Sequence, residues 1–188
     1  MDLRTKKTRR AIREAFLTLR ARKPLERITV KELAELAEIS KATFYLHYQD
    51  VYDLSDHLQQ EAIEAALDKI THPEAFLTDP MQFMQQMVES FAAQRSVTQI
   101  LFSGSQATVF PARIEEAFKS YFNQHFPELR DNCYFQMFLT YQIYGAFSAF
   151  VRNVDTFGRK DALVALHSLS KALADAPQHR ELIAAIPR

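Results

Sequence analysis

Apolar residues recur along most of the chain at intervals of three and four positions, which is the period of an α-helix. Near the start, Ile12, Phe16 and Leu19 follow this spacing and Pro24 ends the segment, so the sequence predicts a helix over residues 5–22. The same pattern predicts further helices over residues 30–37, 41–48, 51–70, 80–95, 96–103, 111–126, 131–155 and 160–175, with a short one after Pro177. Between them, the segment THPEAFLTDP is predicted to be a break.

Composition supports a helical protein. The 188 residues include three glycines and no tryptophan, and 47% of them are hydrophobic, which is enough for a real core. No run of alternating β-branched residues bounded by turn signals is present, so strands are not predicted. The predicted fold class is therefore all-α, with about nine or ten helices.

Three capping signals lie close together near the N-terminus. Thr29 precedes an apolar run and Glu32 follows three residues later, which is the spacing of a capping box. Ser40 is placed to cap the next helix, and Asp50 the one after it. Two short helices separated by a tight turn, with a longer helix before them, form a helix-turn-helix, whose last helix enters the major groove of DNA.

The third helix carries an unusual number of hydrogen-bonding side chains for its length. In EISKATFYLHYQD, polar Lys41, Thr43 and His47 alternate with apolar residues. A DNA partner explains the polar positions, whereas Ala42 and Phe44, with Leu46 as a further candidate, are expected to hold the helix against its neighbours.

The charge is unevenly distributed. Residues 1–53 hold 12 Lys and Arg against 8 Asp and Glu, whereas residues 54–188 hold 11 against 15. A basic segment that meets a polyanion and a solvated charged helix both fit this count. The basic residues before and at the start of the first helix are expected to form either an arm that tracks the DNA or an arm without a role: Arg4, Lys6, Lys7, Arg9 and Arg10.

The stretch TRRAIREAFLTL followed by ITVKELAELAEISKATFYLHYQD resembles the DNA-binding domain of the TetR family of bacterial transcriptional repressors, and TFYLHYQDVYDL resembles a subgroup common in Gram-positive bacteria. The resemblance implies a homodimer that binds a palindromic double-stranded DNA operator. A cytoplasmic location is expected because no apolar segment with a cleavage site follows the basic N-terminal residues. It also implies a DNA-binding domain over residues 1–58 and a helical effector-binding and dimerisation domain over residues 59–188. The effector is expected to be a small molecule of unknown identity.

The residues that the resemblance assigns to DNA are Thr29, Lys31, Ser40, Lys41, Thr43, Tyr45, His47 and Tyr48. Among them, Lys41 and Thr43 are candidates for base edges, and Tyr45 and His47 for phosphates. The sequence departs from the family pattern where Glu38 and Ala42 replace common glycines, and where the start of the fourth helix lacks a lysine. At Glu38 the turn is therefore expected to use another geometry or to strain a residue that is not glycine.

For the rest of the chain the resemblance implies a ligand cavity, although core packing explains the same aromatic residues. The candidates for effector contact are Phe83, Met87, Phe91, Phe118, Phe122, Met137, Tyr141 and Tyr144. The predicted dimer interface lies on the last two long helices, where Gly145 and Ala149 would permit close approach. Its candidate residues are Ile143, Phe147, Phe150, Leu163, Leu166 and Leu173.

Two other classes of protein remain as alternatives, a helical ligand-binding or adaptor protein and an enzyme. Asp53, His57 and Glu61 have a spacing that suits metal ligands, but a solvated stripe explains it better. Cys133 is expected to be a buried, inert thiol. We therefore predict a protein that is not an enzyme, with no cofactor, no metal site and no membrane partner.

Overall fold

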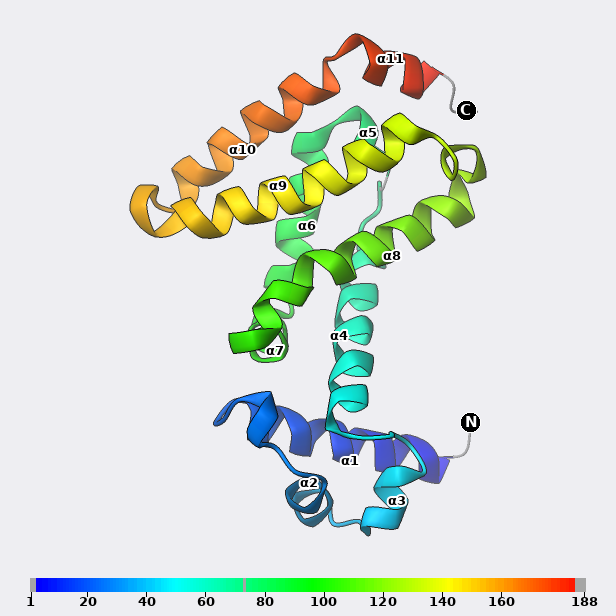
Figure 1. Ribbon diagram of the computed structural model, residues 1–188, viewed down its shortest axis with the longest axis vertical. Helices are drawn as coiled ribbons and strands as arrows, with labels where there is room; N and C mark the ends of the chain where they lie inside the picture. Colours follow the sequence, from blue (N-terminus) through cyan, green and yellow to red (C-terminus); the bar gives the residue numbers. More distant parts are fainter. Residues whose placement is uncertain (1–2, 73, 185–188) are drawn as a thin grey trace. The chain divides into compact units, whose positions relative to one another are not determined.

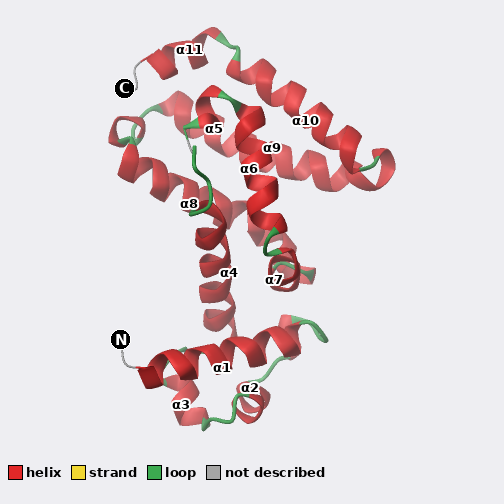
Figure 2. Ribbon diagram, turned by 180° about the vertical axis from the view of Figure 1, so that it is seen from behind, coloured by secondary structure: helices red, strands yellow, loops and turns green. Residues whose placement is uncertain are grey.

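The computed structural model describes residues 3–72 and 74–184, and within these ranges it contains eleven α-helices, three short 3-10 helices and no strand (Figures 1 and 2). The predicted all-α class and the predicted number of helices are confirmed. The additional helix is α5 (Ala75–Thr78), which lies in the segment predicted to be a break. It forms because Ala75, Phe76 and Leu77 are consecutive apolar residues and all three are buried.

The chain divides into two compact units, each made of two separate stretches of the sequence. The first comprises residues 1–64 and 94–110, and the second comprises residues 65–93 and 111–188. This division by compactness differs from the predicted boundary after residue 58, because residues 94–110 pack with the N-terminal residues.

The first unit contains α1 (Leu3–Arg20), α2 (Val30–Leu36), α3 (Lys41–Tyr45), most of α4 (Val51–Leu67) and α7 (Arg95–Leu101), with 3-10 turns at Leu25–Arg27 and Gly104–Val109. Its core is made of large apolar side chains that are almost fully buried: Ile12, Phe16, Leu25, Leu33, Phe44, Leu54 and Leu101. One such residue comes from nearly every element, so burial of these side chains fixes the positions of α2 and α3.

Hydrogen bonds tie residues 94–110 into the first unit. The buried Arg20 on α1 donates to the carbonyl oxygen of Ser103 at 2.7 Å, and burial lowers the pKa of its guanidinium. Gln59 on α4 donates to the carbonyl oxygen of Leu101 at 3.3 Å and to the side-chain oxygen of Gln106 at 3.1 Å. These partners lie more than forty residues from their donors, so the predicted boundary could not include them.

The second unit is built from α5, α6 (Pro80–Ala92), α8 (Phe110–His125, without its first residue), α9 (Cys133–Phe157), α10 (Arg159–Ala174) and α11 (Pro177–Ala184), with a 3-10 turn at Pro127–Leu129. α9 and α10 lie side by side in both views (Figures 1 and 2). At its centre the ring of Phe76 lies 5.3–5.6 Å, between ring centroids, from four other phenylalanines: Phe83, Phe118, Phe122 and Phe138.

Candidate nucleic-acid interface

The entry into α2 is fixed by a reciprocal capping box. The hydroxyl of Thr29 accepts from the backbone N–H of Glu32, and the Glu32 carboxylate accepts from the backbone N–H of Thr29 at 3.1 Å. Lys23 donates to the other carboxylate oxygen of Glu32 at 2.5 Å. This ammonium group, followed by the hydroxyl of Thr29, lowers the pKa of Glu32 from 4.5 to about 2. The predicted cap is confirmed, and Thr29 uses its side chain to hold the helix.

The turn between α2 and α3 is a Schellman motif around a residue that is not glycine. The N–H of Ile39 donates to the carbonyl of Ala34 at 2.9 Å, and the N–H of Glu38 donates to that of Glu35 at 3.2 Å. Glu38 has a φ of 55°, in the left-handed region that favours glycine. The expectation of strain at Glu38 is therefore confirmed.

Side chains cap the start of α3 and the start of α4. Ser40 accepts from the backbone N–H of Thr43 at 3.0 Å, and the two hydroxyls are 2.9 Å apart. At the start of α4, Asp50 accepts from the N–H groups of Tyr52 and Asp53 at 2.7 and 2.8 Å. The predicted caps at Ser40 and Asp50 are confirmed. A further bond, from the N–H of Gln49 to the Asp53 carboxylate at 2.8 Å, ties the α3–α4 link to the first turn of α4.

One side of α3 is held inside the unit. Phe44 is fully buried and Tyr48 is 5% exposed, and their rings lie 5.8 Å apart. The ring of Tyr48 also meets His57 of α4 edge-on at 5.6 Å. The core of the unit therefore covers most of the Tyr48 ring, and the contact of Tyr48 with DNA stays a prediction.

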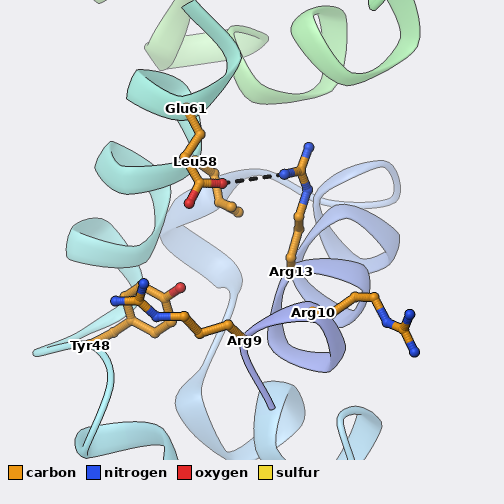
Figure 3. Close-up of a pocket in the computed structure, with 6 residues that line it drawn as sticks. All are labelled: Arg9, Arg10, Arg13, Tyr48, Leu58 and Glu61. Atoms are coloured by element: carbon orange, nitrogen blue, oxygen red, sulfur yellow. Dashed lines mark hydrogen bonds and ion pairs between the residues drawn. The ribbon is translucent and has the colours of Figure 1, made fainter. Parts of the chain in front are cut away.

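A pocket of about 200 Å³ beside Tyr48 is lined by α1 and α4 residues (Figure 3). Arg13 forms an ion pair with Glu61 at 3.3 Å, Arg9 extends toward Tyr48, and Arg10 points away from both. Burial raises the pKa of Tyr48, and the charge of Arg9 opposes that effect. These contacts join α1 to α4 and to Tyr48, which lies between α3 and α4.

The opposite side of α3 is exposed. Lys41, Ala42 and Tyr45 are exposed, and Leu46 reaches 83% exposure. Thr43 and His47 are half-buried at its edges. The expectation that Ala42 and Leu46 hold the helix against its neighbours is wrong, because the buried side chains are those of Phe44 in α3 and of Tyr48 just after it.

The other basic candidates lie on helical surfaces. Lys31 on α2 is exposed and pairs with Glu35 at 3.9 Å, a solvated contact that a phosphate can replace. Lys6, Lys7 and Arg10 lie within α1, which begins at Leu3, and all three are exposed. These three side chains therefore belong to the first helix, and their contact with DNA stays a prediction.

The suspected metal spacing on α4 is used for ordinary contacts. The Nδ1 atom of His57 lies 3.1 Å from the carboxylate of Asp53 and 2.8 Å from its carbonyl oxygen, and Glu61 pairs with Arg13. Across the described ranges, three or more metal-ligating side chains do not gather at any point. Cys133 is exposed, which corrects the expectation of a buried thiol.

The effector candidates do not converge on one place in the second unit. Phe83, Phe118 and Phe122 are buried within the phenylalanine cluster, and Met87 and Phe91 are half-buried. Met137, Tyr141 and Tyr144 instead form an exposed stripe along α9, at spacings of four and three residues. The effector candidates therefore lie in two different environments, the phenylalanine cluster and the exposed surface of α9.

The dimer candidates are also divided between two environments. Leu166 is buried in the single chain, whereas Ile143, Phe147, Phe150, Leu163 and Leu173 are half-buried, and the part that each takes in a dimer stays a prediction. Four apolar residues of α9 and α10 outside this set are more than half exposed, namely Val151, Phe157, Val164 and Leu169. On α10, Ala162, Leu166 and Ser170 face the inside of the unit, which leaves Val164 and Leu169 exposed.

Comparison with known proteins gives one distant relative. An uncharacterized HTH-type transcriptional regulator, YxbF of Bacillus subtilis (strain 168), is 31% identical over 65 residues, a match that takes in 32% of this chain. The chain spans only 17% of that protein's length. No family model matches the chain, and no solved structure matches it. Among the described residues, no helix has both the length and the apolar character to cross a bilayer.

Proposed function

We propose that the protein is a DNA-binding transcriptional regulator of the TetR type, which represses genes by binding a palindromic operator as a homodimer. The observation that carries the proposal is α3, a helix of five residues whose start is capped by Ser40, with a buried side at Phe44 and an exposed side of Lys41 and Tyr45. The distant similarity to an HTH-type transcriptional regulator supports the same class of function.

The roles of the α3 side chains follow from their positions. Lys41 is exposed in the first turn of the helix, where side chains of a recognition helix meet base edges. Tyr45 lies one turn later. Its ring packs edge-on against the buried ring of Phe44, with 5.7 Å between the ring centroids. We assign Lys41 and Thr43 to base contacts, and Tyr45, His47 and Lys31 to the phosphate backbone. The hydroxyl of Thr29 is already engaged by Glu32.

Binding-site selection from random duplex DNA tests these assignments. The wild-type protein is expected to select a palindrome with half-sites ~34 Å apart. Lys41→Ala is expected to relax the motif at one position, since a good base contact discriminates by about 1–3 kcal/mol. Tyr45→Phe is expected to weaken binding to all sequences alike. Recovery of no motif by the wild-type protein would refute sequence-specific binding.

The dimer is assigned to the exposed faces of α9 and α10. Val151, Phe157, Val164 and Leu169 are apolar and more than half exposed. A groove of about 340 Å³ lined by Phe157, Leu169 and their neighbours runs between the two helices. A Cβ built at Gly145 would meet nothing closer than a ring carbon of Tyr141 at 3.9 Å, so packing within the chain does not require glycine there. Close approach of a second α9 supplies a reason for this glycine.

Light scattering at micromolar concentration tests the dimer. The wild-type protein is expected to be dimeric and Gly145→Leu monomeric, because the added side chain blocks the approach of the partner helix. Gln124→Leu, at an exposed position of α8, adds the same side chain elsewhere and should remain dimeric. A monomeric wild-type protein would contradict this assignment.

The second unit is assigned to a small apolar or aromatic effector, with the resemblance and its aromatic residues as support. A ligand that changes operator affinity must bind one arrangement better than the other, and couplings of about 1–3 kcal/mol are typical. A thermal-shift screen followed by operator titration tests this. A ligand that stabilises the protein but leaves operator affinity unchanged at saturation would count against it.

A further inference from the structure

The fold leaves an apolar side chain at the centre of the exposed face of α3. Helical geometry continues past Tyr45, because Leu46 has φ −72° and ψ −17° and its N–H donates to Ala42 at 3.2 Å. Successive side chains of a helix are rotated by about 100°, so Phe44 and Tyr48 share one direction and Leu46 points about 180° away from it. Leu46 is therefore the side chain most directly opposed to the buried side, with Ala42 one turn before it.

The fold does not use this leucine. At 83% exposure it packs little apolar surface within the unit, whereas the buried Phe44 and Tyr48 already fix the helix. The groups on its two sides are polar: Tyr45 on one flank, and Thr43 and His47 on the other. A single isobutyl group and the adjacent methyl of Ala42 form too small an apolar strip to anchor a protein partner, which needs a buried cluster.

Within the major groove, the apolar group that a base pair presents is the C5-methyl of thymine. We propose that Leu46, assisted by Ala42, reads a thymine methyl in each half-site of the operator. This inference rests on the proposed function and adds a specificity-determining residue to it. Lys41 reads hydrogen-bonding groups near the start of the helix, and Leu46 reads shape and apolar contact one turn later.

Replacement of thymine by deoxyuridine removes this methyl group and nothing else, so it provides the test. In the duplex selected by the wild-type protein, each thymine of one half-site is replaced in turn, and the dissociation constant is measured. One replacement is expected to weaken wild-type binding about fourfold, which corresponds to the ~0.8 kcal/mol of one buried methyl group. Leu46→Ala should bind the thymine and deoxyuridine duplexes with equal affinity.

Two variants control this experiment. Leu46→Met keeps an apolar side chain and should retain the preference for thymine. Leu36→Ala removes an exposed leucine from α2 and should retain the full fourfold difference. If no replacement weakens wild-type binding, or if Leu46→Ala shows the same loss as wild type, the inference is wrong while the proposed function stands. If the wild-type protein selects no sequence, the proposed function fails first, and the inference fails with it.

Discussion

The helices α3 and α9 each have one buried and one solvent-exposed face, but the exposed faces carry different kinds of side chain. On α3, the fully buried Phe44 is followed by Tyr45 at 57% exposure, with Lys41 beside it. On α9, the fully buried Leu139 lies next to an outward stripe that includes Met137 and Tyr141. The exposed face of α3 carries hydrogen-bonding side chains around Ala42 and Leu46 and fits DNA, whereas that of α9 is apolar and aromatic. The kind of side chain, rather than the amount of exposed surface, indicates the partner.

The two helices also differ in how much of their structure is specified locally. The starts of α3 and α4 are fixed by side chains two or three residues from their partners, at Ser40 and Asp50. α9 has 25 residues and a single side-chain cap at Asn132. Its orientation depends on contacts with other helices, so its surface is decided by tertiary packing.

The largest expected effect separates the two sides of α3. Phe44→Ala should lower the free energy of unfolding by about 3–5 kcal/mol, because a large buried side chain is removed. Tyr45→Ala should change it by no more than about 0.5 kcal/mol while weakening DNA binding. Urea unfolding of both variants measures this. Equal destabilisation by the two changes would contradict the assignment of the buried and exposed sides.

The same comparison on α9 sharpens the contrast. Leu139→Ala should cost about 2–5 kcal/mol, whereas Met137→Ala, at a position 68% exposed, should cost little and should leave DNA affinity unchanged in the absence of effector. Urea unfolding and operator titration of both variants supply the measurements. A large loss of stability in Met137→Ala would show that its side chain is covered in the single chain.

A smaller effect is expected at the turn before α3. Glu38→Gly should raise the free energy of unfolding by about 1 kcal/mol, since it removes a side chain from a left-handed conformation. Glu38→Ala keeps a Cβ atom at the strained position and should not give this gain. Thermal unfolding of the two variants provides the measurement, and an equal effect of both would refute strain as the cause.

The smallest effect is a dependence on pH at the start of α2. The pKa of Glu32 is lowered to about 2, mainly by Lys23, so its contribution to stability is fully present above about pH 4.5 and is lost as pH falls toward 2. The stability difference between wild type and Glu32→Gln should therefore shrink over this range. Glu35→Gln, which removes only the 3.9 Å pair with Lys31, is the control. A difference that stays constant with pH would contradict the role of Lys23.

Features specified by residues near one another in sequence were predictable. The capping box of Thr29 and Glu32, the caps at Ser40 and Asp50, and the strain at Glu38 all follow from local spacing or from the absence of glycine. Features specified by distant residues were not. Arg20 meets Ser103 across 83 positions, and no local pattern indicates that residues 94–110 belong to the first unit.

For the candidate functional residues, too, local patterns were informative and burial against distant residues was not predictable. The polar character of α3 indicated its outward side, yet Leu46 was assigned to the core and Tyr48 to the surface. Alternation along five or six residues does not distinguish a helical face when polar and apolar residues are interleaved. On α9, apolar residues nearly all round the helix gave no basis for choosing Val151 over Ile143, because the choice depends on which helices pack beside it.

The central claim is that the exposed side of α3 meets the phosphate backbone and bases of DNA. The dependence of binding on salt, measured on the duplex that the protein selects, tests this most directly. For roughly six phosphate contacts, the log–log slope of the binding constant against salt is expected to be about −5 between ~50 and ~200 mM, and less steep for Lys31→Ala. A binding constant that does not change over this range would contradict the account.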